Sequence, residues 1–553
     1  MSPPSPPPAA PDAPSLRLFG FAFAGFLLIA LAVLRPALGG PFISDDIQFI
    51  PDNPFVNGHG GSLAEVLVPG SDAHFYAGGS YQPVTHAFHA LEWRLFTTDT
   101  RGYHVANVLL HALNASLLVL LLVAAAVPSR AALLAGIFFA VHPANVEAVV
   151  WISQSRSLLA LGFALSALLA LERRPLASVP LFCLALLSKS IAAFAIPMAA
   201  AFLWSWHCRG TATRRQAGAL AVWVAALLAF APLEMTGLAT LKPVEARAYA
   251  DAATQLRSIV SIGAHYLWMA ATGAGTAAFH EPQPVRSGLD PWWLSGVVAA
   301  PFFMWRIARG LYLGRLEAAW WLGAAAAYAP VSQVAPFFFP MGDRYLYCIL
   351  PGLIGGTLLA GQGAIARISA RRAGVATRAA TALCAVLLAL FGLRSNARAM
   401  LWQSEEALVR EGAQRYPDGM VGHYVAAVDA VAAGQHELAI SHLRASMNRG
   451  AYVVRSFADD PALAALESNP RFQELVREAS GRRIEFARRR GAVDQYSLRS
   501  IASGHHLRGE IDDAIATLEE ALARGGPLQQ ELEAYVERLR HERDAQRGEG
   551  AGR

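Results

Sequence analysis

Long apolar stretches separated by short polar loops constrain this chain more than any other feature of its sequence. A helix that crosses a bilayer needs about 20 apolar residues. Candidate stretches lie at 16–38, 104–127, 131–150, 155–171, 175–188, 190–207, 216–237, 291–308, 317–336, 345–362 and 376–393. Hydrophobic residues make up 54% of the 553 residues and charged residues only 16%, which excludes an ordinary soluble protein. We therefore expect an all-α, polytopic membrane protein with about 11 spans.

Charge divides the chain into two parts. Residues 1–393 hold 41 charged residues, whereas the much shorter stretch 394–553 holds 46. The sequence therefore predicts a membrane domain at 16–393 followed by a soluble domain at 394–553. The proline-rich segment 1–15 is too poor in apolar residues to pack and is expected to be a disordered cytoplasmic tail.

Arginines predict which loops face the cytoplasm. If the N-terminus is cytoplasmic and segment 258–279 does not span, the inner loops carry thirteen arginines and two glutamates. Such a bias marks the cytoplasmic side of a membrane protein. A full span at 258–279 is the open alternative and would return the C-terminal domain to the cytoplasm. The preferred topology predicts a multi-pass protein of the inner (cytoplasmic) membrane whose C-terminal domain is periplasmic.

Several polar clusters fall on the outer face in this topology. The first outer loop, residues 39–103, opens with the adjacent carboxylates Asp45 and Asp46 and continues with Tyr81 and His86. A loop of this length exceeds an ordinary connection between helices. Polar groups that gather on one membrane face indicate one active site near the lipid boundary.

An ordered series of motifs carries a family resemblance. The aspartate pair after the first span is followed by "NPFV", "SYQPVTH", "YHVANVLLHAL", "HPANVEAVVWISQSRSLLA", "LLSKS" and "MGDRYLYCILPGL". This series resembles the transmembrane and tetratricopeptide repeat-containing O-mannosyltransferases and their bacterial relatives. The resemblance implies a C-type glycosyltransferase fold and a sugar donor linked to polyprenyl phosphate.

Sugar transfer from a lipid phosphate to a hydroxyl group needs a base for the hydroxyl proton. By resemblance, the first acidic residue of the pair is the catalytic one, so Asp45 is the expected base. Asp46 would raise the pKa of Asp45 and orient the acceptor or a metal. Exchange of the two roles stays open, as does a structural role for the pair in capping a loop helix.

The departing phosphate needs cationic groups. Arg344, beside Asp343 at the outer end of a span, is the main candidate for this role. The chain has two lysines, Lys189 and Lys242, and either is a second candidate, with an ordinary interfacial lysine as the alternative. Arg156 is a weaker candidate, because exposed arginines are common.

Two His/Glu pairs complete the set of candidate residues. His142 and Glu147 lie at the outer end of the third predicted span, and a carboxylate near the bilayer is costly unless it has a role. His280 and Glu281 are candidates for a contact with the acceptor or with a metal. A divalent metal stays open, because these residues form no recognisable metal-binding motif. No other cofactor is indicated.

The C-terminal domain contains an internal repeat. The segments "GQHELAISHLRASMNRG" (434–450) and "GEIDDAIATLEEALARG" (509–525) match at an offset of 75 residues, close to two tetratricopeptide periods. Stacked helix pairs of this kind form a concave surface suited to peptides. The domain is slightly acidic, with 22 basic and 24 acidic residues, so a nucleic-acid partner is not expected.

The leading interpretation is a membrane glycosyltransferase that uses a polyprenyl-phosphate-linked sugar and a protein acceptor held by the repeats. Transfer to a glycolipid or an envelope polysaccharide is an alternative within the enzymes. A non-catalytic membrane scaffold, in which the aspartates are structural, is the alternative from another class.

Overall fold

A computed structural model describes residues 15–58, 61–240, 249–334, 340–365, 370–454, 456–489, 495–524 and 528–550. Within these ranges every regular element is a helix, and His280 and Met341 form an isolated bridge. The predicted all-α class of a polytopic membrane protein is thus confirmed. Most of the proline-rich tail, residues 1–14, lies outside the described residues, and so does Lys242.

Sixteen α-helices make up the first part of the described chain, which we call the membrane part (residues 16–401). They are α1 (Leu16–Leu34), α2 (Asp45–Phe49), α3 (Pro54–Asn57), α4 (Pro83–Phe96), α5 (Thr100–Ala124), α6 (Ser129–Ala140), α7 (Asn145–Val150), α8 (Ser155–Arg173), α9 (Pro175–Ser188), α10 (Ala195–Cys208), α11 (Arg214–Thr240), α12 (Ala252–Thr272), α13 (Pro291–Tyr312), α14 (Glu317–Tyr328), α15 (Leu346–Ile365) and α16 (Ala370–Leu401). Short 3-10 turns join them: η1 (Arg35–Gly39), η2 (Leu63–Leu67), η3 (Asp72–Ala77), η4 (Ile152–Gln154), η5 (Ser190–Phe194), η6 (Ala329–Val331) and η7 (Asp343–Tyr345).

Seven helical segments in the described ranges are long and apolar enough to cross a membrane. They are Leu16–Gly39, Thr100–Ala124, Ile152–Arg173, Ser190–Cys208, Arg214–Thr236, Asp343–Gln362 and Ala382–Leu401. Each overlaps one of the eleven predicted stretches. The other four stretches form α6 with α7, α9, α13 and α14. The total of eleven spans therefore stays a prediction, as does the placement of segment 258–279, most of which lies in α12.

Proline explains why two predicted spans are interrupted. Helix α6 ends at Ala140, three residues before Pro143, and α7 starts only at Asn145. Helix α14 ends at Tyr328, and Pro330 lies in the 3-10 turn that follows it. A proline lacks the N–H that helix continuation needs and disfavours helical geometry in the residue before it. Apolar composition alone does not show such breaks.

Small residues allow close helix packing inside the membrane part. Gly352 and Gly356 of α15 are spaced as in the GxxxG motif of membrane helices. A Cβ atom at Gly352 would lie 2.6 Å from the Trp320 carbonyl oxygen of α14. The backbones of α14 and α15 therefore touch where a larger side chain would separate them.

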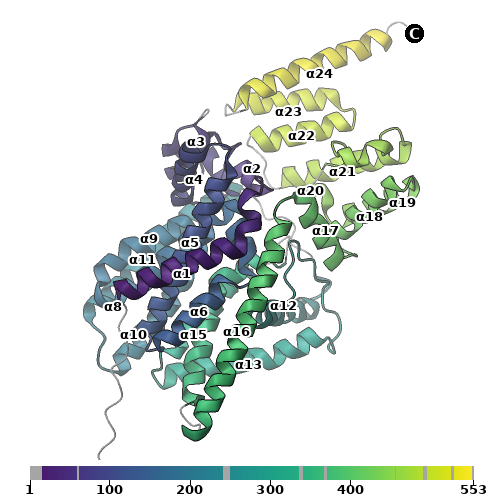
Figure 1. Cartoon of the computed structure of the whole chain (residues 1–553). Coiled ribbons are helices and arrows are strands. Elements are labelled where there is room, and N and C mark those ends of the chain that lie inside the picture. The colour runs from purple at the N-terminus through teal and green to yellow at the C-terminus, as the bar shows by residue number, and fades with distance from the viewer. Residues whose placement is uncertain are drawn as a thin grey trace, which may run out of the picture.

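The second part of the described chain, which we call the repeat part (residues 402–550), is a stack of shorter helices. They are α17 (Glu405–Arg415), α18 (Met420–Ala432), α19 (His436–Asn448), α20 (Ala451–Val454), α21 (Pro470–Arg489), α22 (Gln495–Leu507), α23 (Ile511–Ala523) and α24 (Gln529–Gly550), with the 3-10 turn η8 (Pro461–Leu466). Figure 1 shows α22, α23 and α24 stacked one upon another at the C-terminal end. The stack has two apolar cores, one around Leu443 and Leu475 and one around Leu518 and Leu532.

The two matching sequence segments form equivalent helices. Each becomes a helix of 13 residues, α19 or α23. Each of these helices follows a glycine with positive φ, Gly434 at +73° and Gly509 at +78°, a conformation that glycine adopts without strain. The 75-residue offset thus corresponds to a structural repeat, and its assignment to the tetratricopeptide class stays a prediction.

The two parts meet within a continuous helix. The predicted boundary at residue 394 falls inside α16, which continues to Leu401 (Figure 1). Trp402 and Leu408 still pack in the core of the membrane part. The chain therefore leaves the membrane part several residues later than the change in composition indicates.

Contacts place the first outer loop and the repeat part on the same side of the spans. Asp52, in the turn between α2 and α3, lies close enough to Arg499 and Glu531 for their charges to affect its pKa. Glu281, in the loop after α12, accepts hydrogen bonds from the backbone N–H groups of Met420 and Val421. These contacts require the two regions to share a compartment, and the periplasm stays the predicted one.

We expect single cysteines introduced at Asn57 and at Gln435 both to react with a membrane-impermeant maleimide in intact cells. The background is a variant without the four native cysteines, Cys183, Cys208, Cys348 and Cys384. A third introduced cysteine in the predicted inner loop at Arg209 serves as the control and should react only after the membrane is permeabilised. Labelling of Asn57 without Gln435, or the reverse, would contradict the shared compartment.

Candidate active site

A strained turn presents the aspartate pair. Ser44, directly before α2, has φ +55° and ψ −121°, which non-glycine residues seldom adopt. Gly40 lies nearby, and a Cβ atom there would be 2.6 Å from the Trp402 carbonyl oxygen. Contacts from the rest of the fold must hold such a turn in place. The turn sets Asp45 and Asp46 at the start of α2, where they have different surroundings.

Asp46 is buried, with only 1% of its surface exposed. Its Oδ1 accepts a hydrogen bond of 2.7 Å from the Ser153 N–H, and its Oδ2 accepts one of 3.1 Å from the Ile43 N–H. Burial raises the pKa of Asp46 to about 7, although these hydrogen bonds favour the charged form. Asp46 therefore fastens the first outer loop to η4 of the membrane part.

Asp45 remains accessible, with 43% of its side chain exposed. Its Oδ2 lies 3.7 Å from Nη2 of Arg156, at the start of α8. The Arg156 guanidinium also lies over the ring of Phe49, 4.9 Å from the ring centre. Of the two carboxylates, Asp45 is the one that a substrate from outside can reach.

Arg344 is held in place by a carboxylate and two aromatic rings. Glu147 of α7 is buried and accepts hydrogen bonds from both the backbone N–H and Nη1 of Arg344. The guanidinium carbon lies 5.1 Å from the ring centre of Trp151 and 4.7 Å from that of Tyr345. This arrangement orients the Arg344 guanidinium and limits its movement.

Lys189, between α9 and η5, completes a cationic group. Its Nζ donates a hydrogen bond of 2.8 Å to Ser157 Oγ, which in turn donates to Gln154 Oε1. Burial lowers the pKa of Lys189 well below its usual value, and the nearby charges of Arg156 and Arg344 act in the same direction. Both arginines in turn interact electrostatically with Asp45. The fold thus gathers residues from four segments that are far apart in the sequence.

We call this set the Asp45 cluster: Asp45, Glu147, Arg156, Lys189 and Arg344. Three basic side chains face two carboxylates, one of which, Glu147, is already bonded to Arg344. Like charges that are brought together in a partly buried place repel one another unless an anion joins them. The cluster is therefore suited to an anionic group such as a phosphate, with an accessible carboxylate beside it.

Three other predicted site residues join the membrane part to the repeat part. Asp343 is fully buried, and its carboxylate accepts from His280 Nε2 at 2.7 Å and from Arg398 Nη2 at 2.8 Å. The other ring nitrogen of His280 lies 3.1 Å from the Tyr416 hydroxyl. Glu281 binds the N-terminal N–H groups of α18. The polar groups of these side chains therefore form contacts at the junction between the two parts. The contacts with donor, acceptor or metal that the sequence predicts for them stay predictions.

His142, Tyr81 and His86 are also engaged within the protein. His142 contacts the Ala270 carbonyl through Nε2 and accepts from the Ala144 N–H through Nδ1. The Tyr81 hydroxyl donates to the Leu67 carbonyl, and its backbone N–H donates to Glu234. His86 lies between the carbonyl oxygens of Gln82 and Ala73, and burial lowers its pKa to about 4. Their predicted contacts with substrate are not tested by this geometry.

The structure adds residues that the sequence does not single out. Trp151 lies against Arg344, packs on Trp402 and donates from Nε1 to the Ile43 carbonyl. The Tyr345 ring lies against the Arg344 guanidinium, and the Ser157 hydroxyl accepts a hydrogen bond from Lys189. Tyr345 directly follows Arg344, and Trp151 and Ser157 lie within the motif that contains Arg156, but their role depends on distant partners. Lys242, the alternative lysine, lies outside the described residues.

A group of three potential metal ligands occurs elsewhere among the described residues. His505, Glu510 and Asp513 lie within reach of one another on α22, α23 and their connecting turn. His505 already contacts Glu510 through Nδ1 and Arg488 through Nε2, and Glu510 also pairs with Arg508. The group therefore supplies no ligands for a divalent metal at the aspartate pair, and that metal stays an untested alternative.

Comparison with known proteins points to one kind of transferase. No family model matches the chain. A protein O-mannosyl-transferase of Caenorhabditis elegans is 33% identical over 208 residues, which are 34% of this chain and 29% of the relative. The protein O-mannosyl-transferase Tmtc1 of Drosophila melanogaster is 35% identical over 133 residues, 23% of this chain and 15% of the relative.

The chain is similar to O-mannosyl-transferases over about a third of its length. The match covers less than a third of either relative, so the similarity concerns a portion of those proteins. It agrees with the family resemblance of the sequence motifs. Both relatives are animal proteins, and a bacterial source for this chain stays a prediction.

The two aspartates should differ in their effect on stability. Asp46→Ala leaves the buried N–H groups of Ile43 and Ser153 without an acceptor, which costs about 1–3 kcal/mol for each group. Asp45→Ala removes a half-exposed side chain and should leave the melting temperature close to that of the unchanged protein. Thermal unfolding of the purified protein in detergent, followed by tryptophan fluorescence, measures both. Equal melting temperatures for the two variants would contradict the structural role of Asp46.

Asp343→Asn should destabilise the junction between the two parts. It removes the carboxylate that pairs with buried Arg398 and leaves that arginine with Glu411 at 3.6 Å. Removal of one partner of a buried ion pair costs about 3–5 kcal/mol. Asp418→Asn, at an exposed position in the turn before α18, is the matched control and should have no effect. Limited proteolysis between residues 402 and 420, together with thermal unfolding, reports the change. Unchanged proteolysis of Asp343→Asn would refute this role.

Proposed function

We propose that this protein is a membrane glycosyltransferase that moves a sugar from a polyprenyl-phosphate donor to a hydroxyl group of a protein acceptor. The observation that carries the proposal is the Asp45 cluster, in which one accessible carboxylate lies beside three basic side chains. The partial similarity to protein O-mannosyl-transferases supports the same reaction class. The reaction would take place at the extracytoplasmic face of the inner membrane.

The proposed transfer assigns two tasks to the cluster. Asp45 takes the proton of the acceptor hydroxyl, and the resulting oxygen attacks the anomeric carbon of the sugar. The bond between that carbon and the phosphate oxygen breaks, and polyprenyl phosphate leaves with the bonding electrons. Protonated Asp45 then releases its proton to water. These reaction steps need an exposed carboxylate, which Asp45 supplies, and a fixed phosphate-binding group, which Arg344 supplies.

The cationic side chains would stabilise the departing phosphate. Arg344 is oriented by Glu147 and by two aromatic rings, so little entropy is lost when it binds an anion. Arg156 adds positive charge from α8, and Lys189, directly after α9, would become charged when an anion binds, because burial lowers its pKa in the absence of an anion. Because these cations already lie close together, their mutual repulsion is relieved as negative charge develops on the phosphate.

The accessible position of Asp45 favours it over Asp46 as the base. Asp46 has both oxygens occupied by backbone N–H groups, and little of it is exposed. The charges of Asp45 and Asp46 nevertheless interact, because the two side chains are adjacent. Asp46 thus acts on the base through position and charge.

The alternative readings differ from this proposal in what they require of the Asp45 cluster. A transferase that acts on a glycolipid or envelope polysaccharide uses the same cluster with a different acceptor. A scaffold does not require Asp45 for its activity. Mass spectrometry of extracytoplasmic proteins and glycolipids, from cells with and without the gene, would distinguish the two acceptor classes.

Asp45→Asn should lower turnover by about 10²–10⁴-fold, because it keeps the shape of the side chain but removes the base. Donor binding should be largely kept. Arg344→Ala should weaken donor binding as well as turnover, and Arg101→Ala, at an exposed position at the start of α5, is the control. Sugar release from a lipid-linked donor and equilibrium binding of that donor measure the two effects.

Folded Asp45→Asn protein with full turnover would rule out Asp45 as the base. If Asp46→Asn then abolished turnover without loss of folding, the roles of the two aspartates would be exchanged. If neither change affected transfer in cells, the scaffold would be the better explanation.

A further inference from the structure

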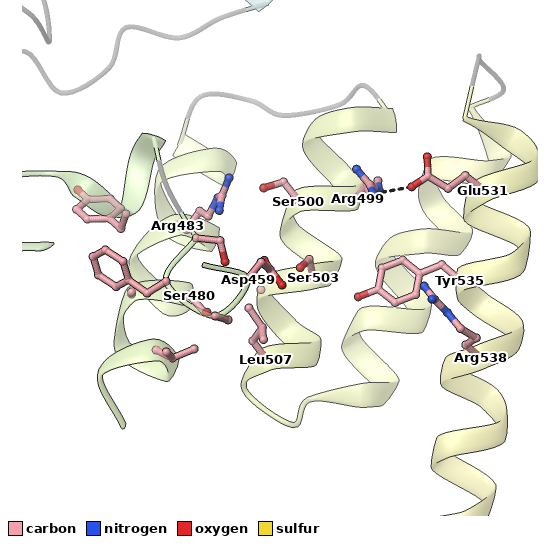
Figure 2. A pocket seen from close by; sticks show the side chains of 17 residues that line it. Asp459, Ser480, Arg483, Arg499, Ser500, Ser503, Leu507, Glu531, Tyr535 and Arg538 are labelled. Atoms are coloured by element: carbon pink, nitrogen blue, oxygen red, sulfur yellow. Dashed lines mark ion pairs between the residues drawn. The ribbon is translucent and has the colours of Figure 1, made fainter. Parts of the chain in front are cut away.

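A polar groove lies in the repeat part, outside the Asp45 cluster. It has a volume of about 450 Å³ and is bordered by α21, α22 and α24, with Tyr452 of α20 and residues 456–459 at one end. Figure 2 shows side chains from α22 and α24 facing the same space, among them Arg499, Ser503 and Tyr535. A space of this size is typical of sites that bind small molecules or short peptide segments.

Two of the three arginines in the groove lack a carboxylate partner among the described residues. Arg499 pairs with Glu531, as the dashed line in Figure 2 marks. Arg538 lies over the ring of Tyr535, 5.0 Å from its centre. Arg483 is half-buried and interacts with Asp459 only through its charge. In the described structure, neither Arg483 nor Arg538 forms an ion pair with an acidic side chain. Both guanidinium groups can therefore pair with a carboxylate of a ligand.

The remaining lining suits an extended peptide. Ser500 supplies a hydroxyl group that can donate to or accept from a peptide backbone. The Tyr535 hydroxyl is engaged by His506 and Ser503. Its ring, with those of Tyr452 and Phe457, therefore supplies aromatic surface. The concave side of stacked helices binds peptides in this manner in other repeat proteins. Lining arginines outnumber lining carboxylates by three to two, so the charge favours an acidic ligand.

The groove is next to the loop that carries the aspartate pair. Burial and the charge of Glu531 raise the pKa of Asp52, and the charge of Arg499 lowers it. Asp52 directly follows the turn that ends α2, and both Arg499 and Glu531 line the groove. A peptide bound in the groove would therefore lie near the loop that carries Asp45.

We propose that this groove binds an extended, acidic segment of the acceptor protein and presents a neighbouring hydroxyl side chain to Asp45. Arg483 and Arg538 would contact the carboxylates of that segment, and the Ser500 hydroxyl its backbone. The proposal deepens the acceptor side of the function proposed above and rests on it. Binding to the groove itself can be measured without any transfer of sugar.

The test uses the full-length protein in detergent and two fluorescent peptides. The acidic peptide contains Glu, Ser and Gly, and the neutral one has Gln in place of each Glu. We expect the acidic peptide to bind at least about tenfold more tightly at low salt and to lose this advantage at high salt. The double variant Arg483→Gln, Arg538→Gln should weaken binding of the acidic peptide by about tenfold or more. It should not change binding of the neutral peptide.

Matched controls separate the groove from general surface charge. Arg524→Gln together with Arg540→Gln removes the same charge from α23 and α24 outside the groove and should leave binding unchanged. Arg483→Glu with Arg538→Glu should reverse the preference toward a peptide with Lys in place of Glu. Circular dichroism and thermal unfolding establish that each variant is folded.

Three results would overturn the proposal. They are equal binding of the acidic and neutral peptides, unchanged binding by the folded Arg483→Gln, Arg538→Gln variant, and equal loss in the control variant. Asp45→Asn should bind the acidic peptide normally. Peptide binding without sugar transfer by the unchanged protein would therefore count against the proposed reaction and not against the groove.

Discussion

The buried carboxylate of Asp343 joins three segments of the membrane part beside its junction with the repeat part. It accepts from the His280 ring, from the Arg398 guanidinium and from the Ala277 backbone N–H, so it joins the loop after α12, the start of α15 and the end of α16. Arg398 continues the connection to Glu411 in α17, and Tyr416 continues it from His280. A buried charge is tolerated only when such partners surround it. The position of the repeat part over the outer loops depends on this arrangement.

The aspartate pair shows how one fold gives two identical side chains different properties. Asp45 and Asp46 are adjacent, yet one is half-exposed beside a guanidinium and the other is buried between two backbone N–H groups. Burial is the main reason that the pKa of Asp46 rises to about 7. Pairs of carboxylates whose surroundings differ in this way are common where one must exchange protons and the other must not.

The Asp45 cluster and the groove carry positive charge for different purposes. In the cluster, the cations lie at the outer ends of helices in the membrane part, where a lipid phosphate would be found. In the groove, Arg483 and Arg538 lie in the repeat part, away from lipid, where a soluble protein segment would be found. The loop that contains both Asp45 and Asp52 lies between the two sites. A donor from the membrane and an acceptor from solution would thus meet at one loop.

The sequence by itself determined the all-α class, the division into an apolar part and a charged part, and the internal repeat. These properties follow from composition and periodicity, which act locally along the chain. It also placed Asp45, Arg156, Lys189, Glu147 and Arg344 among the candidates, through the family resemblance of the motifs, the need for cations at a phosphate and, for Glu147, the cost of a carboxylate near the bilayer. The structure brings these five together.

Only the tertiary structure decided which candidate residues lie together in the Asp45 cluster and which have their partners at the junction. In the sequence, polar residues of the junction look like the members of the Asp45 cluster. The partners of Asp343, His280 and Glu281 are Arg398, Tyr416 and the N-terminus of α18, each more than fifty residues away. Likewise, the arginines of the groove resemble ordinary surface arginines until their neighbours are known. Pairing between distant charges depends on three-dimensional distance, which local sequence patterns do not contain.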